Sequence, residues 1–185
     1  MNTIIGSYTL DGNEVPIDVC DYVQIALFGN NAKNNGAVML ISKSDISSCL
    51  NYKWYLSKAG YPVAYTSVDQ KEKFGTGIKI HRFLEPLVPK DMVVDHINRD
   101  RLDNRRTNLR ICTIAENGYN KTRTKKYKGI RQLKSGWIAS ITKNGTKHEI
   151  KNIPTEKQAA EMYDIMAEEL FGNFAAKNFS DSTGQ

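Results

Sequence analysis

Three side chains in the second half of the chain have the chemistry needed to hydrolyse a phosphodiester bond with the help of a metal ion. Asp95 offers an anionic oxygen ligand and Asn117 a neutral amide oxygen ligand, and both suit a hard divalent cation. His96 carries an imidazole that can take a proton from water near pH 7. These three groups predict a small hydrolytic site, provided that the fold brings them together.

The surrounding sequence predicts one strand–loop–strand–helix segment that would do so. Residues 93–94 are apolar and predict a short strand, and residues 109–112 predict a second one after a polar loop. Thr113 is a good helix N-cap, and Glu116 completes a capping box with it. Neighbouring side chains on a strand point to opposite faces, so we expect the first strand to end at His96.

The spacing of these residues resembles the ββα-metal (HNH) endonuclease motif, in the variant whose last histidine is an asparagine. Asn108 follows Asp95 by thirteen residues, and Asn117 comes nine residues later. The resemblance implies that His96 activates the attacking water while Asp95 and Asn117 hold a divalent ion, Mg²⁺ or another such as Mn²⁺. Asn108 is expected to be required for catalysis, by fixing the loop or by contacting the second ring nitrogen of His96.

A run ahead of the motif is similar to that of phage and intron homing-type HNH proteins. The matching segments are Lys53-Trp54, Gly60-Tyr61 and His81-Arg82. Trp54 is expected in the core. Arg82 could clamp a phosphate through two parallel hydrogen bonds. Alternatively, one of His81 and Arg82 points into the core and the other is solvated, because the alternation of residues 78–84 predicts a strand.

Arginines crowd the motif, with Arg101 among them. A run of charges usually forms a solvated face. Beside a site that cleaves phosphodiesters, however, we expect DNA phosphate contacts from Arg99, Arg105, Arg106 and Arg110. Asparagine and aspartate side chains commonly cap the backbone of loops, which predicts a structural polar turn for Asn98, Asp100, Asp103 and Asn104.

The last third of the chain predicts a second domain. After a basic linker at 123–127, short strands are expected at 129–132, 137–142 and 147–153, and Asn144-Gly145 is a hairpin signal. A helix is expected to open at Thr155 and to stop at Gly172. Its apolar face should pack on the sheet through Ala159, Met162, Tyr163, Met166 and Leu170. Its acidic face should point to solvent through Glu156, Glu161, Asp164, Glu168 and Glu169.

Residues 126–180 resemble the ethylene-response-factor (apetala-two) DNA-binding domain of plants, which is also found fused to HNH nucleases. The resemblance rests on YKGIRQ, GWIASI and KHEIKNIPTEKQAAEMYDIMAEELF. In that family the sheet lies in the major groove, which implies DNA contacts from Lys128, Arg131, Lys134, Thr142 and Lys147. Leu133, Thr142 and Glu149 replace Arg or Trp of the plant domains, so their base preference is not expected here. Trp137 is expected to pack in the core.

The composition fits a small protein that acts on DNA. The 185 residues carry a net charge of +6, with a pI near 9.1, which favours a polyanionic partner. No apolar run approaches the roughly 18 residues of a membrane span, and no signal peptide is recognisable, so we expect a cytoplasmic protein without a membrane partner. The three cysteines form no Cys-x-x-Cys pair, which predicts neither a disulfide framework nor a zinc cluster.

Together these features predict an α+β protein. A ββα-metal nuclease domain (37–122) would follow an N-terminal segment of unknown role (1–36) and precede the linker, a three-stranded antiparallel sheet packed on one helix (128–180) and a tail (181–185). We expect a homing-type, site-recognising endonuclease of double-stranded DNA that needs no small-molecule cofactor. Two alternatives remain open: a restriction-type HNH nuclease with a shorter target, and a DNA-binding regulator with an inactive nuclease fold.

Overall fold

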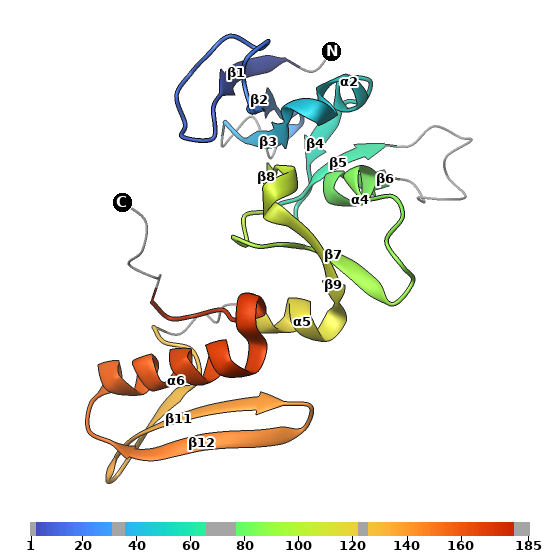
Figure 1. The fold of residues 1–185 in the computed structure, drawn as a ribbon. Coiled ribbons are helices and arrows are strands. Elements are labelled where there is room, and N and C mark those ends of the chain that lie inside the picture. The colour runs from blue at the N-terminus through green and yellow to red at the C-terminus, as the bar shows by residue number, and fades with distance from the viewer. Residues whose placement is uncertain (1–2, 31–35, 66–76, 122–125, 180–185) are drawn as a thin grey trace. The chain divides into compact units, whose positions relative to one another are not determined.

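The computed structural model describes residues 3–30, 36–65, 77–121 and 126–179, which belong to two compact units (Figure 1). The first unit is Met1–Cys112 and the second is Thr113–Gln185. This division differs from the boundaries predicted at 36/37 and 122/123, which stay predictions. Most of the predicted linker at 123–127 and all of the tail at 181–185 lie outside the described residues.

The first unit contains a four-stranded sheet with the order β1-β2-β3-β8. Its strands are β1 (Ile4–Tyr8), β2 (Tyr22–Ala26), β3 (Val38–Ser42) and β8 (Asp103–Asn104). The first three strands are antiparallel, and β8 joins β3 in parallel. Strand β2 buries alternate residues, Val23 and Ile25, as expected of a strand with one face on the core. Thus β1 and β2, from the segment of unknown role, help to build the sheet that carries β8 in the motif loop.

A second sheet has the order β4-β5-β6 and packs into the same core. Its strands are β4 (Trp54–Leu56), β5 (Pro62–Tyr65) and β6 (Gly77–Lys79). The turns η1 (Lys43–Asp45) and α2 (Ile46–Cys49) precede it. Trp54 is 0% exposed, which confirms its predicted place in the core, and its indole N–H donates to the Cys49 carbonyl at 2.9 Å. None of the three cysteines, all of which the structure describes, forms a disulfide, and all three are buried.

Residues 78–84 do not form the predicted strand. Strand β6 ends at Lys79, and the helix α4 (Ile80–Leu84) begins directly after it. The alternation was misleading because Ile80 and Leu84, which are four residues apart, are both buried on one face of this short helix. In α4, His81 is buried and Arg82 is exposed.

The two motif strands form a small sheet of their own, which is made of β7 (Met92–His96) and β9 (Leu109–Thr113). The turn η3 (Arg106–Asn108) precedes β9. Beyond the end of β7, the Ile97 N–H donates to the Asn108 carbonyl at 2.9 Å. Strand β7 therefore ends at His96, as the sequence predicted.

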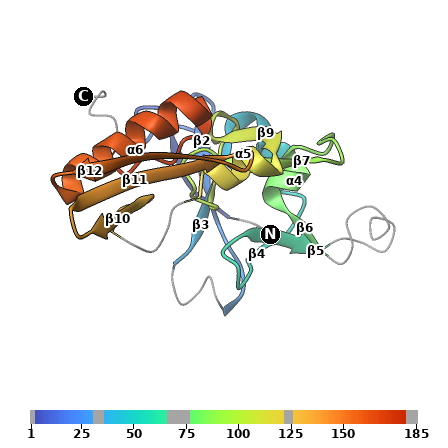
Figure 2. The same cartoon turned by 90° about the horizontal axis from the view of Figure 1, so that it is seen from below.

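The second unit contains the predicted three-stranded antiparallel sheet packed on one helix (Figure 2). Its elements are α5 (Ile114–Tyr119), β10 (Ile130–Leu133), β11 (Gly136–Lys143), β12 (Thr146–Ile153), α6 (Glu156–Phe171) and η4 (Gly172–Phe174). Asn144 and Gly145 have φ values of 49° and 80°, the left-handed conformations of a tight hairpin. The prediction of an α+β protein is confirmed. In the part of the chain that the structure describes, no helix is long and apolar enough to cross a membrane.

Two predictions about the faces of α6 are wrong. Met162 is 37% exposed and does not belong to the buried face, whereas Tyr163 and Met166 do. Asp164 is only 8% exposed, because its carboxylate accepts the backbone N–H groups of Asn178 at 2.7 Å and Phe179 at 2.9 Å. Asp164 thus fixes the chain that follows the helix, a contact that helical periodicity does not reveal.

Candidate active site

Strand β7 delivers Asp95 and His96 at its buried end. Asp95 is 7% exposed and His96 is 5% exposed. Two adjacent polar residues at the end of an otherwise apolar strand need partners, because an unpaired buried polar group is destabilising. The partners of these two side chains therefore decide what the site can do.

His96 is held by Asn104, a residue that the sequence placed in a structural turn. The Nε2 atom of His96 lies 3.0 Å from Oδ1 of Asn104, which is 0% exposed. Asn104 Nδ2 donates to the carbonyl of Arg101 at 3.1 Å, so its amide oxygen is the atom that faces the ring. Oδ1 can only accept, so Nε2 of His96 donates to it and carries the ring proton in this arrangement.

Two more rings pack beside His96. His81 meets it edge to face at 5.3 Å between centroids, and Tyr61 lies 5.2 Å from His81 and 6.2 Å from His96. Burial is the largest cause that lowers the pKa of His81 from 6.5 to about 3, followed by electrostatic interactions with His96, Lys79 and Arg82. His81 is therefore neutral at pH 7. Its Nδ1 is buried without a hydrogen-bond partner among the described residues.

Asp95 forms an ion pair with Arg110 on the neighbouring strand β9. Nε and Nη2 of Arg110 both donate to Oδ2 of Asp95, at 3.0 and 2.8 Å. The two side chains are 7% and 15% exposed, so the pair is largely shielded from water. Arg110, which the sequence placed among the phosphate contacts, compensates the negative charge of Asp95 in this structure.

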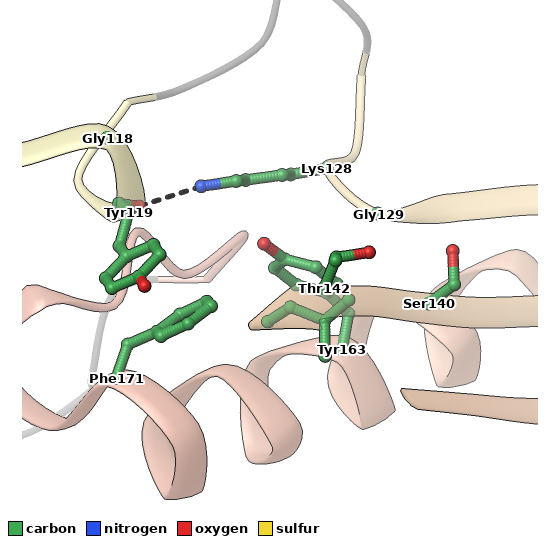
Figure 3. Close-up of a pocket in the computed structure, with 9 residues that line it drawn as sticks. Gly118, Tyr119, Lys128, Gly129, Ser140, Thr142, Tyr163 and Phe171 are labelled. Atoms are coloured by element: carbon green, nitrogen blue, oxygen red, sulfur yellow. Dashed lines mark hydrogen bonds between the residues drawn. The ribbon is translucent and has the colours of Figure 1, made fainter. Parts of the chain in front are cut away.

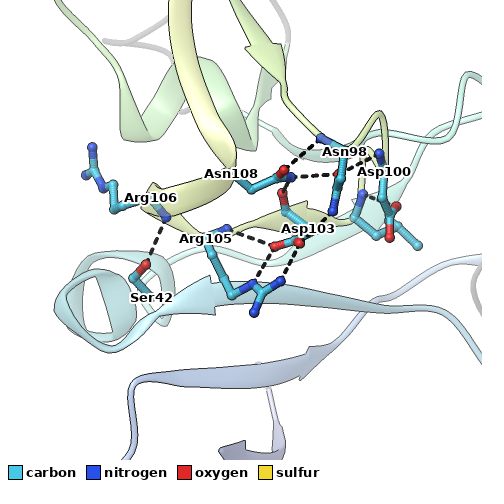
Figure 4. A network of polar contacts seen from close by, with 8 residues as sticks. Ser42, Asn98, Asp100, Asp103, Arg105, Arg106 and Asn108 are labelled. Carbon is cyan, nitrogen blue, oxygen red and sulfur yellow. Dashed lines mark hydrogen bonds and ion pairs between the residues drawn. The ribbon is translucent and has the colours of Figure 1, made fainter. Parts of the chain in front are cut away.

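Asn108 fixes the loop between the two strands (Figure 4). Its Oδ1 accepts the N–H of Asn98 at 2.9 Å, and its Nδ2 donates to Oδ1 of Asn98 and to the Asp103 carbonyl at 2.9 and 2.7 Å. Asp100 accepts the N–H of Leu102, a local turn contact of the predicted kind. Of the two positions expected for Asn108, the structure shows the one in the loop, while Asn104 contacts the ring of His96.

Arg105 and Arg106 tie the loop to the fold. Arg105 binds Asp103 through Nε and Nη2 at 2.8 and 2.7 Å, and Arg106 binds Asp45 at 2.9 and 2.8 Å and Glu85 at 2.6 Å. Burial alone would raise the pKa of Asp103, but the hydrogen bonds and charge of Arg105 outweigh it and hold that pKa below its usual value. The acidic residues that pair with Arg106 could not be predicted from the sequence, because Asp45 and Glu85 are far away along the chain.

Other basic residues on this unit are more accessible. Arg82 and Arg99 are exposed, and Arg99 adopts a left-handed backbone with φ of 69°. Arg101 and Lys79 both lie over the ring of Tyr61, at 4.7 and 4.6 Å from its centroid. Sequence reasoning missed these two cations as site residues, although it singled out Tyr61. They place positive charge on a ring that is packed against His81 and His96.

The second unit contains Asn117 and the remaining predicted contacts. Asn117 is half-buried on α5, whose N-terminus has the predicted capping box of Thr113 and Glu116.

Lys128 is half-buried beside a cavity of about 290 Å³, and its Nζ donates to the Tyr119 carbonyl at 2.9 Å (Figure 3). The strands of the sheet carry three exposed predicted contacts, Arg131, Thr142 and Lys147, and exposed Lys134 lies in the turn between β10 and β11. Lys147 is paired with Glu149, and Trp137 packs against the core as predicted.

Comparisons with known proteins identify the family. A protein of Acanthamoeba polyphaga mimivirus, named as an uncharacterised HNH endonuclease, is 44% identical to this chain over 165 residues, which are 86% of the chain and 82% of that protein. The chain belongs to the HNH endonuclease family. A family model described as HNH endonuclease matches residues 85–119 of this nuclease, the segment that contains β7, β9 and α5. No solved structure matches significantly.

HNH endonucleases generally use a divalent metal ion, and the donors of this chain can be tested for it. Among the described residues, no group of three or more His, Cys, Asp or Glu side chains could hold a metal ion. A structural zinc site therefore does not fit. A hard ion that keeps most of its water needs only one or two carboxylates, and the Asp95 carboxylate is a donor of that kind.

Proposed function

We propose that this nuclease is a metal-dependent, site-recognising DNA endonuclease of the homing type. The observation that carries the proposal is the buried end of β7, where Asp95 and His96 lie within the matched segment and His96 is oriented by Asn104. The homing type is supported by the segments ahead of the motif, Gly60-Tyr61 and His81-Arg82, of which the rings of Tyr61 and His81 lie beside His96.

His96 acts as the general base. Its Nε2 donates to Oδ1 of Asn104 at 3.0 Å, and this contact orients the imidazole that takes a proton from the attacking water. The rings of His81 and Tyr61 pack on its sides and limit rotation of the imidazole. A base that is fixed before the substrate arrives does not have to be ordered during the reaction.

Asp95 and Asn117 would hold a divalent ion, Mg²⁺ by preference or Mn²⁺. Such an ion would supply charge stabilisation for the phosphate and for the departing 3′ oxygen. Asp95 contributes one negative charge and Asn117 none, so most of the coordination is left to the substrate and to water. Asn108 keeps the loop that carries Asn104 in place and so supports His96 indirectly.

The DNA backbone is bound by cations around the rings and in the motif loop. Exposed Arg82 and Arg99, with Lys79 and Arg101 over the Tyr61 ring, have no acidic partner among the described residues. Arg105 and Arg106 each form ion pairs with acidic side chains, so less of their positive charge is available to DNA phosphates. Guanidinium and ammonium groups that neutralise phosphates make binding strongly dependent on salt.

The second unit supplies additional DNA affinity as an ethylene-response-factor-like domain. Support comes from its sheet-plus-helix fold, from exposed Arg131, Thr142 and Lys147 on that sheet, and from exposed Lys134 in the turn between β10 and β11. Sheets of two or more strands are known to enter DNA grooves. In this proposal the motif cleaves the phosphodiester bond, and the sheet positions the protein on double-stranded DNA.

Separation of binding from cleavage tests the proposal. We expect His96→Ala to abolish cleavage and to retain the DNA affinity of the wild type, measured by fluorescence anisotropy on duplexes selected from a randomised library. Arg131→Ala should weaken binding and still cleave at high protein concentration. Lys157→Ala removes one charge from exposed α6 and serves as the matched control. Loss of binding in folded His96→Ala, or unchanged affinity in Arg131→Ala, would contradict these assignments.

A further inference from the structure

The Asp95–Arg110 pair has a consequence for the order in which metal and DNA bind. Arg110 donates two hydrogen bonds, from Nε and Nη2, to one carboxylate oxygen, Oδ2 of Asp95. The pair is largely buried and lies on adjacent strands of a two-stranded sheet, so it belongs to the folded framework and not to a mobile surface. The summed charge of the pair is zero. A carboxylate in this state is a poor attractor of a divalent cation.

A bound cation and Arg110 would repel one another, because both positive groups would share the Asp95 carboxylate. Such repulsion is stronger at a shielded site than on an open surface. A DNA phosphate can relieve it in two ways: it adds negative charge, and its oxygens match the planar donor pattern of a guanidinium. Arg110 is already in place for this exchange, since it is 15% exposed and holds its donors beside the proposed metal ligand.

We propose that Arg110 couples metal binding to DNA binding. Without DNA, Arg110 neutralises Asp95 and keeps the affinity for divalent ions low; with DNA, the phosphate takes over part of the interaction with Arg110 and Asp95 becomes an effective ligand. The coupling is reciprocal, so the metal ion also tightens DNA binding. This inference rests on the proposed role of Asp95 as a metal ligand.

Binding of Mn²⁺ to the full-length protein without DNA tests the proposal, with free Mn²⁺ measured by electron paramagnetic resonance. Arg110→Gln should bind Mn²⁺ at least tenfold more tightly than the wild type, because the positive charge of Arg110 no longer offsets the negative charge of the Asp95 carboxylate. Arg110→Lys keeps the charge and should stay close to the wild type. Lys90→Gln removes one charge from an exposed position and should leave Mn²⁺ affinity unchanged. An Arg110→Gln protein that binds Mn²⁺ no more tightly than the wild type would overturn the proposal.

Two further measurements make the outcome unambiguous. Adding Asp95→Asn to Arg110→Gln should abolish the gain; a gain that survives would mean that Asp95 is not the ligand, which overturns the metal site itself. If Arg110→Gln does not fold, Mn²⁺ binding to the wild type with and without DNA can still refute the coupling. Its Mn²⁺ affinity should rise at least tenfold with duplex DNA, after subtraction of the Mn²⁺ that the DNA binds alone, and Arg110→Lys should retain most of this rise. Equal Mn²⁺ affinity with and without DNA would refute the coupling.

Discussion

Acidification from pH 7 to pH 5 should destabilise the first unit through His81. The ring is 7% exposed on α4, and burial is the largest cause that lowers its pKa from 6.5 to about 3. Below pH 6.5 the unfolded chain therefore binds a proton at His81 that the folded protein does not bind. The unfolded state gains free energy from this proton, so stability falls as the pH falls.

The size of the effect follows from the two pKa values of His81. Between them, one extra proton in the unfolded state changes the free energy of unfolding by about 1.4 kcal/mol per pH unit. From pH 7 to pH 5 the loss is about 2 kcal/mol, since titration of the unfolded state begins near pH 6.5. A loss of this size is a considerable part of the roughly 5–15 kcal/mol that stabilises a typical domain.

Urea unfolding reports this loss through Trp54, which is 0% exposed in the same core. Trp137→Phe in both proteins leaves Trp54 as the sole tryptophan. The free energy of unfolding of the protein with His81, minus that of His81→Leu, should fall by about 2 kcal/mol from pH 7 to pH 5. Other titrating groups largely cancel in this difference. A difference that stays constant across this range would refute the assignment of a neutral, buried His81.

Three further perturbations follow from the same structure. Asn104→Leu removes the acceptor of His96 Nε2 and should slow single-turnover cleavage by about 10- to 100-fold without weakening DNA binding. The double substitution Lys79→Gln/Arg101→Gln should reduce the slope of log affinity against log salt by about 1.8, measured by anisotropy in chelator, if each contacts one phosphate. Asp164→Ala leaves two backbone N–H groups unpaired and should destabilise α6 by about 1–3 kcal/mol, measured by amide hydrogen exchange.

Each of these perturbations has a control or a contradicting result. Unaltered cleavage by folded Asn104→Leu would show that the ring of His96 does not need this partner. Replacing the exposed lysines Lys53 and Lys90 by Gln removes the same charge from positions that are not over the Tyr61 ring and should leave the salt slope unchanged. Glu169→Ala, on the exposed side of α6, should not alter hydrogen exchange. An Asp164→Ala protein that behaves like Glu169→Ala would contradict the role given to that carboxylate.

Local signals predicted much of the fold. The capping box at Thr113, the left-handed pair Asn144-Gly145 and the helix end at Gly172 are all present, because each depends on side chains and backbone within a few residues. Trp54 was also placed correctly, since a large apolar ring in an apolar strand is rarely left exposed. In these cases the chemistry that decides the structure is contained in a short stretch of sequence.

Errors arose where a distant partner decides the environment of a residue. Arg106 meets Asp45, which is 61 residues earlier, so its charge is used in an ion pair. Asp164 reads as part of an acidic face until the backbone of Asn178 returns to it. Residues 80–84 alternate like a strand but form about one turn and a half of helix, too short for the helical period to be visible.

The candidate site shows the same division between local and distant information. The spacing of Asp95, His96 and Asn117 was enough to predict the family, because ligands and a base are needed at fixed positions in one segment. The residues that orient them were not predictable. Nothing in the sequence distinguishes Asn104 from the other asparagines of the loop. The pairing of Arg110 with Asp95 depends on how two strands align, which the sequence does not show, so Arg110 was predicted to contact DNA instead.

Cleavage of a supercoiled plasmid library with randomised inserts tests the central claim most directly, with wild type and His96→Ala compared in Mg²⁺ and in chelator. The randomised inserts supply a target even if it is long, and sequencing of the cut ends reports its length. We predict open-circle or linear product from the wild type in Mg²⁺, and none in chelator or from His96→Ala. Equal product from wild type and His96→Ala, or product in chelator, would contradict metal-dependent hydrolysis with His96 as the base.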